Sequence, residues 1–206
     1  AVPESSFQKD APHVAQTGYP PPRGTLIGQG TLRAGIVGFQ DRPLTPSEME
    51  QMKFLLDDQL NQGALGLSLG LIYPPGSFSP TSELRELARV VQKHKKILAV
   101  HMRNEGPNIF QAVEEMLSIA EETGVHLHIS HLKLMGKAQW GQAPRLLERI
   151  EASRQRGAVV TCDQYPYTAT STILAALLPR RAYDGGSAAK LRRVSDPDPS
   201  LHRDIA

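Results

Sequence analysis

Two histidines, His101 and His131, are the residues whose type and position point most directly to chemistry. Each comes at the end of a short apolar run, and each is followed by a turn and then by a helical pattern. This order predicts an imidazole at the carboxyl end of two successive parallel strands, where α/β enzymes keep their catalytic groups. Neutral imidazoles are ligands for divalent metals such as zinc. A single histidine of this kind is more often a hydrogen-bonded rim residue, but two in neighbouring βα units favour a metal site.

Further polar side chains are found on the loops that follow the predicted strands. These loops cover residues 70–76, 101–106, 130–133 and 163–172. In a βα barrel they would share one rim. They supply imidazoles that suit a metal, cations that suit a carboxylate, and hydroxyls that suit an oxyanion. This set favours metal-assisted hydrolysis of a substrate that bears a carboxylate.

These loops are positioned by a regular alternation of strand and helix patterns that begins at Gly24. Strands are expected to start near residues 25, 64, 97, 125 and 158. The intervals, about 28–39 residues, match the length of a βα unit. A series of five such units without a reversal predicts an α/β fold with a parallel sheet or barrel.

Local signals place several elements within this frame. Residues 45–48 read Thr-Pro-Ser-Glu, a capping box that predicts a helix start. Residues 34–37 are interpreted as a segment that follows the first strand. His126 and His128 lie two positions apart in the fourth strand, so alternation puts them on one face and His131 on the other. We expect this pair to point toward the helical layer and not to bind a metal.

Cys162 and Asp163 lie at the end of the fifth predicted strand. We expect Cys162 to be a small buried hydrophobe, and Asp163 to hydrogen-bond the turn over residues 165–170. Because Cys162 is the sole cysteine of the chain, an intrachain disulfide is excluded, and a reducing compartment such as the cytoplasm is expected. Arg103 and Glu105 are expected to pair or to brace their loop.

Composition bounds the class of protein and its organisation. The 206 residues carry a formal net charge of +2, which indicates no nucleic-acid or membrane partner. No run approaches the roughly 20 apolar residues of a membrane span. We expect an irregular Pro-rich lead-in over residues 1–23, barrel units over residues 24–172, and the start of an insertion or tail over residues 173–206. Since the first residue is Ala1 and not Met, we also expect a processed chain or one cut from something longer.

Four segments of the chain resemble one known family. They read Gly-Ala-Leu-Gly-Leu-Ser-Leu-Gly-Leu-Ile-Tyr-Pro-Pro-Gly, His-Met-Arg-Asn-Glu-Gly, Ile-Ser-His-Leu-Lys and Asp-Gln-Tyr-Pro-Tyr-Thr-Ala. They are similar to the N-acyl-D-amino-acid deacylases (D-aminoacylases) of the amidohydrolase superfamily, and the resemblance is dense from about Gly28 to Asp184. It implies the central part of a (β/α)8 TIM-type barrel, with about five consecutive βα units. It also implies zinc-dependent hydrolysis of N-acyl-D-amino acids to a carboxylate and a free D-amino acid.

The resemblance implies a role for each residue that matches a family motif. His101 and His131 match two of the family's zinc ligands. Tyr73 matches a tyrosine that lines the substrate site and helps to polarise the scissile carbonyl. The family's first-strand His-x-His pair, a cysteine ligand and a late aspartate have no match here. The order of the motifs puts the pair before Ala1 and the aspartate after Ala206.

A second group of residues matches the part of the family site that binds the substrate carboxylate. Lys133 matches a lysine that faces this carboxylate. Tyr165 or Tyr167, with Ser171, matches the segment that binds the same group, and the sequence does not choose between the two tyrosines. The partner that the resemblance implies is a small-molecule N-acyl-D-amino acid.

Two alternatives stay open. A truncated or split-gene product would be non-catalytic, or would act only with a complementary chain or as a homo-oligomer. A cyclic-amide hydrolase of the same superfamily, such as a dihydroorotase or hydantoinase, would keep the fold and change the substrate. An open five-stranded sheet has two unpaired edges, so we also expect the isolated chain to associate or to be poorly soluble.

Overall fold

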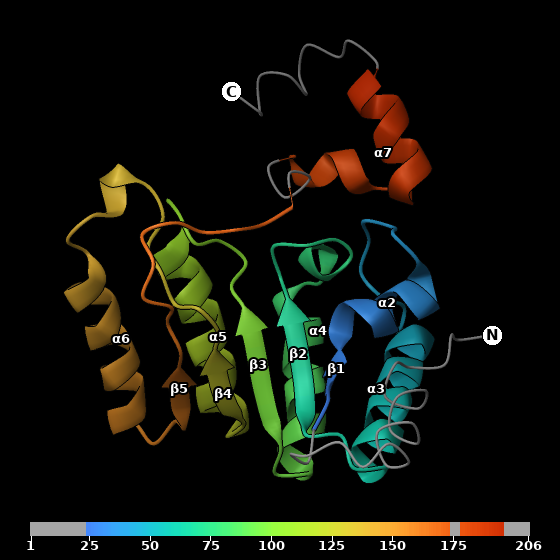
Figure 1. Cartoon of the computed structure of the whole chain (residues 1–206). Helices are drawn as coiled ribbons and strands as arrows, with labels where there is room; N and C mark the ends of the chain where they lie inside the picture. Colours follow the sequence, from blue (N-terminus) through green and yellow to red (C-terminus); the bar gives the residue numbers. More distant parts are fainter. Residues whose placement is uncertain (1–23, 174–177, 196–206) are drawn as a thin grey trace, which may run out of the picture.

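A computed structural model of the chain describes residues 24–173 and 178–195 (Figure 1). Its centre is one parallel sheet with the strand order β1-β2-β3-β4-β5. The strands are β1 (Leu26–Gly28), β2 (Gly66–Gly70), β3 (Ile97–His101), β4 (His126–Ile129) and β5 (Val160–Cys162). Strands that follow one another along the chain are neighbours in the sheet, as in a βα barrel. The predicted α/β fold, with five consecutive βα units of a barrel, is confirmed.

Helices connect the strands and follow the last of them. They are α2 (Gln29–Val37), α3 (Pro46–Asn61), η1 (Gly76–Phe78), α4 (Thr81–Lys93), α5 (Ile109–Thr123), η2 (Lys137–Gln139), α6 (Ala143–Gln155), η4 (Arg180–Tyr183) and α7 (Gly186–Ser195). The last two lie over the loop after α2, where Arg180 forms an ion pair with Asp41 and the Gly185 amide donates to the Phe39 carbonyl. In Figure 1 they stand above the carboxyl ends of the strands.

The hydrophobic core lies between the sheet and the helices. Every second residue of the middle strands is fully buried in it, namely Leu67, Leu69, Leu98, Val100, Leu127 and Ile129. The residues between them face the other way, because side chains alternate along a strand. Ser68, Ala99, His128 and Thr161 stand side by side in this second set, in register across four strands. We call the side of the sheet that carries them the open face.

The prediction that His126 and His128 point toward the helical layer is wrong. Leu127 and Ile129, which alternate with them, are 0% exposed in the core. The two imidazoles therefore lie on the open face of β4. The prediction assumed that regular alternation continues as far as His131, and the backbone does not continue in that way.

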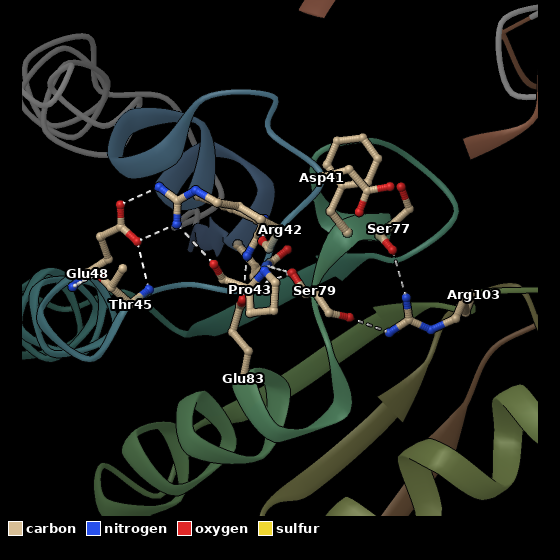
Figure 2. Close-up of polar contacts among 12 residues, drawn as sticks. Asp41, Arg42, Pro43, Thr45, Glu48, Ser77, Ser79, Glu83 and Arg103 are labelled. Carbon is tan, nitrogen blue, oxygen red and sulfur yellow. Dashed lines mark hydrogen bonds and ion pairs between the residues drawn. The ribbon is translucent and has the colours of Figure 1, made fainter. Parts of the chain in front are cut away.

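The capping box at the start of α3 is confirmed. Thr45 Oγ1 accepts a hydrogen bond from the Glu48 amide at 3.3 Å, and the Glu48 carboxylate accepts one from the Thr45 amide at 2.7 Å. Arg42 donates two more hydrogen bonds to the same carboxylate, at 2.8 and 2.7 Å (Figure 2). These bonds from Arg42, followed by the one from the Thr45 amide, lower the pKa of Glu48 to about 2. The start of α3 is thus stabilised by the hydrogen bonds of the capping box and by the ion pair of Arg42 with Glu48.

In the first βα unit, α2 follows β1 directly, and residues 34–37, interpreted as a segment after the first strand, form its last turn. This helix buries two polar side chains. Arg33 forms an ion pair with Glu83 of α4, and Gln29 donates to Ser79 Oγ at 2.7 Å and to Glu83 at 3.0 Å. Cys162 differs from expectation, since it is exposed.

Several sequence-based expectations concern segments beyond the described ones. The Pro-rich lead-in over residues 1–23 lies outside the described residues, as do residues 174–177 and 196–206. The expected segment boundaries therefore stay predictions. None of the helices in residues 24–173 and 178–195 is both long enough and apolar enough to cross a membrane.

Candidate active site

His101 is the last residue of β3 and stands in register with Gly70 of β2. Alternation puts its side chain on the open face, together with Ala99. Its imidazole has a lowered pKa, first because burial disfavours the charged ring and then because of the charge of His131. A lowered pKa keeps the ring neutral near pH 7, which is the form that binds a metal ion.

His131 reaches the same point by a different route. β4 ends at Ile129, and regular alternation would send the side chain of residue 131 into the core. Instead, the backbone of His131 is left-handed, with a φ of 42°, which is uncommon for a residue other than glycine. Its amide donates a hydrogen bond of 2.6 Å to Asp163 Oδ1. The turn directs the His131 ring toward His101.

The two imidazoles face each other across a short gap. His101 Nδ1 and His131 Nε2 are within hydrogen-bond distance, and the ring centroids are 4.4 Å apart at an interplanar angle of 50°. Two nitrogens that converge in this way fit two ligands of one metal ion. Within residues 24–173 and 178–195, no group of three or more His, Cys, Asp and Glu side chains is arranged to hold a metal. The donor set on hand therefore fits part of a metal site.

Glu105 and Lys133 flank the other nitrogen of His131. Glu105 Oε1 lies 3.0 Å from His131 Nδ1, and Lys133 Nζ lies 2.9 Å from the same atom. These contacts require opposite tautomers, since a carboxylate accepts the Nδ1 proton and an ammonium donates to a bare Nδ1. A metal on Nε2 requires the first tautomer, with the proton on Nδ1. Lys133 Nζ keeps two acceptors in either case, Glu105 Oε1 at 2.6 Å and the His131 carbonyl at 3.0 Å.

A pocket of about 630 Å³ opens beside the histidines. The seven residues selected from the sequence all line it, namely Tyr73, His101, His131, Lys133, Tyr165, Tyr167 and Ser171. His101 ends β3 and the other six come from the loops after β2, β4 and β5, so the expectation of a shared rim describes their positions correctly. Glu105 lines the same pocket and was expected only to pair with Arg103 or to brace its loop.

The loop that carries Tyr73 is fastened to the loop after His101 by Arg103. Figure 2 shows the Arg103 guanidinium donating to the carbonyls of Ser77 and Ser79, both at 3.0 Å. The same guanidinium makes a two-bond ion pair with Glu115, at 2.9 and 3.1 Å. The expected pairing of Arg103 with Glu105 is therefore wrong, because each has a different partner. At the pocket, the same loop places Tyr73 Oη 2.9 Å from Thr172 Oγ1.

Close packing also shapes this loop at Gly76. A Cβ atom at this position would lie 2.7 Å from the carbonyl oxygen of Gly70 and 3.1 Å from Gln29 Oε1. Contacts under 3 Å to backbone are not tolerated, so glycine lets the loop fold back onto the end of β2. The Tyr73 side chain is presented from this compact turn.

The two candidate tyrosines differ in their surroundings. Lys133 Nζ lies 5.6 Å from the centroid of the Tyr165 ring. The Tyr165 hydroxyl is buried and has no hydrogen-bond partner among the described residues. Tyr167 is 75% exposed, and its ring stacks on that of Tyr165 with centroids 6.4 Å apart.

Asp163 also has contacts that differ from those expected. It was expected to hydrogen-bond the turn over residues 165–170, but its carboxylate accepts from the His131 amide and lies 2.8 Å from His128 Nε2. The hydrogen bond from His131, followed by the one from His128, holds the pKa of Asp163 below its usual range. Its place beside His131 follows from the strand register of the structure, in which Ile129 pairs with Cys162 and the residues after them are neighbours.

A parallel βα sheet that presents two facing imidazoles, a tyrosine and a lysine at its carboxyl ends has the architecture of metal-dependent barrel hydrolases. No family model matches the chain. A D-aminoacylase from Alcaligenes xylosoxydans xylosoxydans is 39% identical over 149 residues, which cover 72% of this chain and 31% of the relative. The chain thus spans about a third of that relative's length.

Solved structures give the same result. A D-aminoacylase described as defining a novel subset of amidohydrolases superposes with a TM-score of 0.67 at 40% identity, over 70% of this chain and 30% of that one. An N-acyl-D-glutamate deacylase from Bordetella bronchiseptica, in complex with zinc and a phosphonate mimic of the tetrahedral intermediate, superposes with a TM-score of 0.74 at 31% identity. That match covers 94% of this chain and 44% of the other. The resemblance read from the motifs is confirmed: over the matched residues the chain is a relative of the N-acyl-D-amino-acid deacylases.

Proposed function

We propose that the protein hydrolyses the amide bond of N-acyl-D-amino acids and releases a carboxylate and a free D-amino acid. The observation that carries the proposal is the meeting of His101 Nδ1 and His131 Nε2 in a pocket that also holds Tyr73 and Lys133. The likeness to D-aminoacylase over 72% of this chain supports the same reaction. The matched part is 31% of that enzyme, so the activity of the whole enzyme is carried over here as a proposal.

We propose zinc as the metal, held in part by His101 and His131. The zinc in the solved N-acyl-D-glutamate deacylase supports this choice. When bound, zinc would polarise the amide carbonyl and lower the pKa of water toward about 7. Glu105 would accept the Nδ1 proton of His131 and so keep the lone pair of Nε2 free for the metal. Catalytic zinc sites usually have three protein ligands, so the two histidines make up part of the set.

The remaining pocket residues bind and orient the substrate in this proposal. The Tyr73 hydroxyl donates to the carbonyl oxygen as negative charge develops on it. Lys133 and Tyr165 bind the α-carboxylate, with Ser171 as a further hydroxyl in the same pocket. We favour Tyr165 over Tyr167, because a carboxylate would supply the acceptor that the buried Tyr165 hydroxyl lacks among the described residues.

Release of free D-amino acid from N-acetyl-D-amino acids tests the proposal in the full-length protein, with zinc content measured in parallel. We expect His131→Ala to abolish metal-dependent release. His94→Ala is the matched control, because His94 pairs with Asp57 on the helices and does not line the pocket. Wild-type turnover by His131→Ala with zinc still bound would contradict the proposal. Turnover of dihydroorotate in place of N-acetyl-D-amino acids would favour the cyclic-amide alternative.

The variants Tyr165→Phe and Tyr167→Phe test the carboxylate end of the pocket. A hydrogen bond to a charged group contributes about 1.5–3 kcal/mol, so we expect Tyr165→Phe to raise KM about tenfold or more. Tyr167→Phe removes an exposed hydroxyl and should change KM little. Equal effects of the two variants would contradict the choice of Tyr165.

A non-catalytic polypeptide is the candidate from another class. The pair of histidines that fits part of a metal site among the described residues is compatible with either reading, so metal binding and turnover must be measured. Absence of both bound zinc and turnover in the purified full-length protein would favour this reading over the hydrolase.

A further inference from the structure

The parallel pairing of β4 and β5 continues past the ends of both strands. The Asp163 amide donates to the Ile129 carbonyl at 3.1 Å, and the Leu132 amide donates to the Asp163 carbonyl at 2.9 Å. The His131 amide lies between these two bonds, at the left-handed turn. It has no carbonyl partner in the ladder, and Asp163 Oδ1 accepts its hydrogen bond at 2.6 Å.

The second oxygen of the same carboxylate is also held. Asp163 Oδ2 lies 2.8 Å from His128 Nε2 on the open face. The other nitrogen of that ring, Nδ1, lies 2.9 Å from Thr161 Oγ1, and His126 Nε2 lies 3.1 Å from the same hydroxyl. A series of hydrogen bonds therefore runs from the middle of β4 and β5 to the backbone of His131. Neither of the two strand histidines lines the pocket.

We propose that Asp163 is a positioning residue of the metal centre, and that His128 and Thr161 hold its carboxylate in place. This inference rests on the proposed function only in naming His131 as a metal ligand. A left-handed backbone is unfavourable for histidine, and a carboxylate that accepts the turn's amide stabilises it with a charge-assisted hydrogen bond. Without that acceptor, the turn would relax toward ordinary backbone and carry the His131 ring away from His101.

The substitutions Asp163→Asn and Asp163→Ala should have different effects, because an asparagine can still form both hydrogen bonds. In Asp163→Asn, the amide oxygen can still accept from the His131 amide. The Nδ2 group then faces His128 Nε2, and since it donates, Nε2 must become an acceptor. His128 would then carry its proton on Nδ1 and donate to Thr161 Oγ1, which is 2.9 Å away. The series survives with its direction reversed, so Asn should rescue the turn where Ala does not.

Nuclear magnetic resonance of the metal-free protein tests the turn without relying on zinc or turnover. Amide exchange of His131 and the tautomer of His128 are followed in wild type, Asp163→Asn and Asp163→Ala. We expect slow exchange in wild type and Asn, fast exchange in Ala, and a shift of the His128 proton from Nε2 to Nδ1 in Asn alone. Unchanged His131 exchange in Asp163→Ala, or an unchanged His128 tautomer in Asp163→Asn, would overturn the inference.

Zinc affinity, measured by chelator competition, provides the second readout. Changes to residues that orient metal ligands typically weaken binding about 10–100-fold, so we expect a loss in this range for Asp163→Ala and less than about threefold for Asp163→Asn. Asp57→Ala is the matched control, because Asp57 makes the same 2.8 Å contact with a histidine away from the pocket. Equal zinc affinity in wild type and Asp163→Ala would count against the inference. A wild-type protein that binds no zinc would remove the proposed function, while the exchange measurement would still decide whether Asp163 holds His131.

Discussion

Glu105 Oε1 lies 3.0 Å from His131 Nδ1, while Nε2 of the same ring faces His101. A carboxylate behind a metal-binding imidazole fixes its tautomer and raises its basicity. Glu105 also lies 2.6 Å from Lys133 Nζ, so one carboxylate contacts both the proposed metal-binding imidazole and the cation.

The first prediction concerns this carboxylate. Glu105→Gln removes its charge with little change of shape, and we expect zinc affinity to fall about tenfold or more because the His131 ring loses its anionic partner. Isothermal titration with zinc measures the change. Glu121→Gln is the control, since Glu121 pairs with Arg156 on the surface. An affinity equal to that of wild type would show that Glu105 serves Lys133 alone.

The second prediction concerns the clamp on the Tyr73 loop. Arg103→Lys cannot reproduce the two bonds to Glu115 together with those to the carbonyls of the loop, because an ammonium lacks the planar fork of a guanidinium. We expect kcat to fall, with zinc content unchanged, since the variant loosens Tyr73 and not the histidines. Steady-state kinetics and metal analysis separate these effects. Arg85→Lys, which alters an ion pair between α4 and α5, should leave kcat unchanged. Loss of zinc in Arg103→Lys would contradict the assignment.

The third prediction concerns the buried ion pair of Arg33 and Glu83. Arg33 is 0% exposed, so Glu83→Gln would leave its charge without a buried partner. Breaking a buried pair in this way costs about 3–5 kcal/mol of unfolding free energy. Urea unfolding followed by circular dichroism measures it. A loss below about 1 kcal/mol would indicate that the Arg42 carbonyl, which also accepts from Arg33, is a sufficient partner.

The fourth prediction concerns pH and the start of α3. The hydrogen bonds from Arg42, the largest cause, and from Thr45 lower the pKa of Glu48 from its ordinary value of 4.5 to about 2. A lowered pKa in the folded state stabilises the fold above the unfolded value, and this contribution is lost as pH falls through the folded value. Wild type should therefore exceed Glu48→Gln in unfolding free energy at pH 7, and the difference should shrink from about pH 4.5 toward pH 2. A difference that stays constant over that range would contradict the assignment.

Periodicity and motif order predicted the parts of the molecule that local physics determines. The capping box at Thr45 and the strand over residues 97–101 were placed correctly, because a side-chain cap and an apolar run act over a few residues. The left-handed turn at His131 could not be read in this way. Its partner, Asp163, is 32 residues away, and contacts between separate strands depend on register and not on local pattern.

The same limit explains the error at His126 and His128. Alternation correctly predicts that these two side chains share one face of the strand. It does not predict which face packs against the helices, because that depends on how all the strands pack together. The faces of His126 and His128 were assigned relative to His131. That assignment failed because the backbone of His131 is left-handed and no longer follows the geometry of the strand. The residues of the pocket could be predicted from the sequence. Parallel strands end at one edge of the sheet, so the loops that follow them lie together whatever the conformation of each turn.

The open face of the sheet has a consequence for how the chain meets its surroundings. Ser68, His128 and Thr161 present hydroxyls and an imidazole there, while the leucines and valines of the same strands point to the helices. Contact of this face with water therefore exposes few apolar side chains. The hydrophobic packing that stabilises the sheet lies on its other side, against the helices. The two edge strands, β1 and β5, have outer backbone groups with no neighbouring strand within the described residues. These groups can therefore bind a further strand. A strand added at either edge would be held by main-chain hydrogen bonds. Such bonds depend on the spacing and direction of the added strand more than on its side chains.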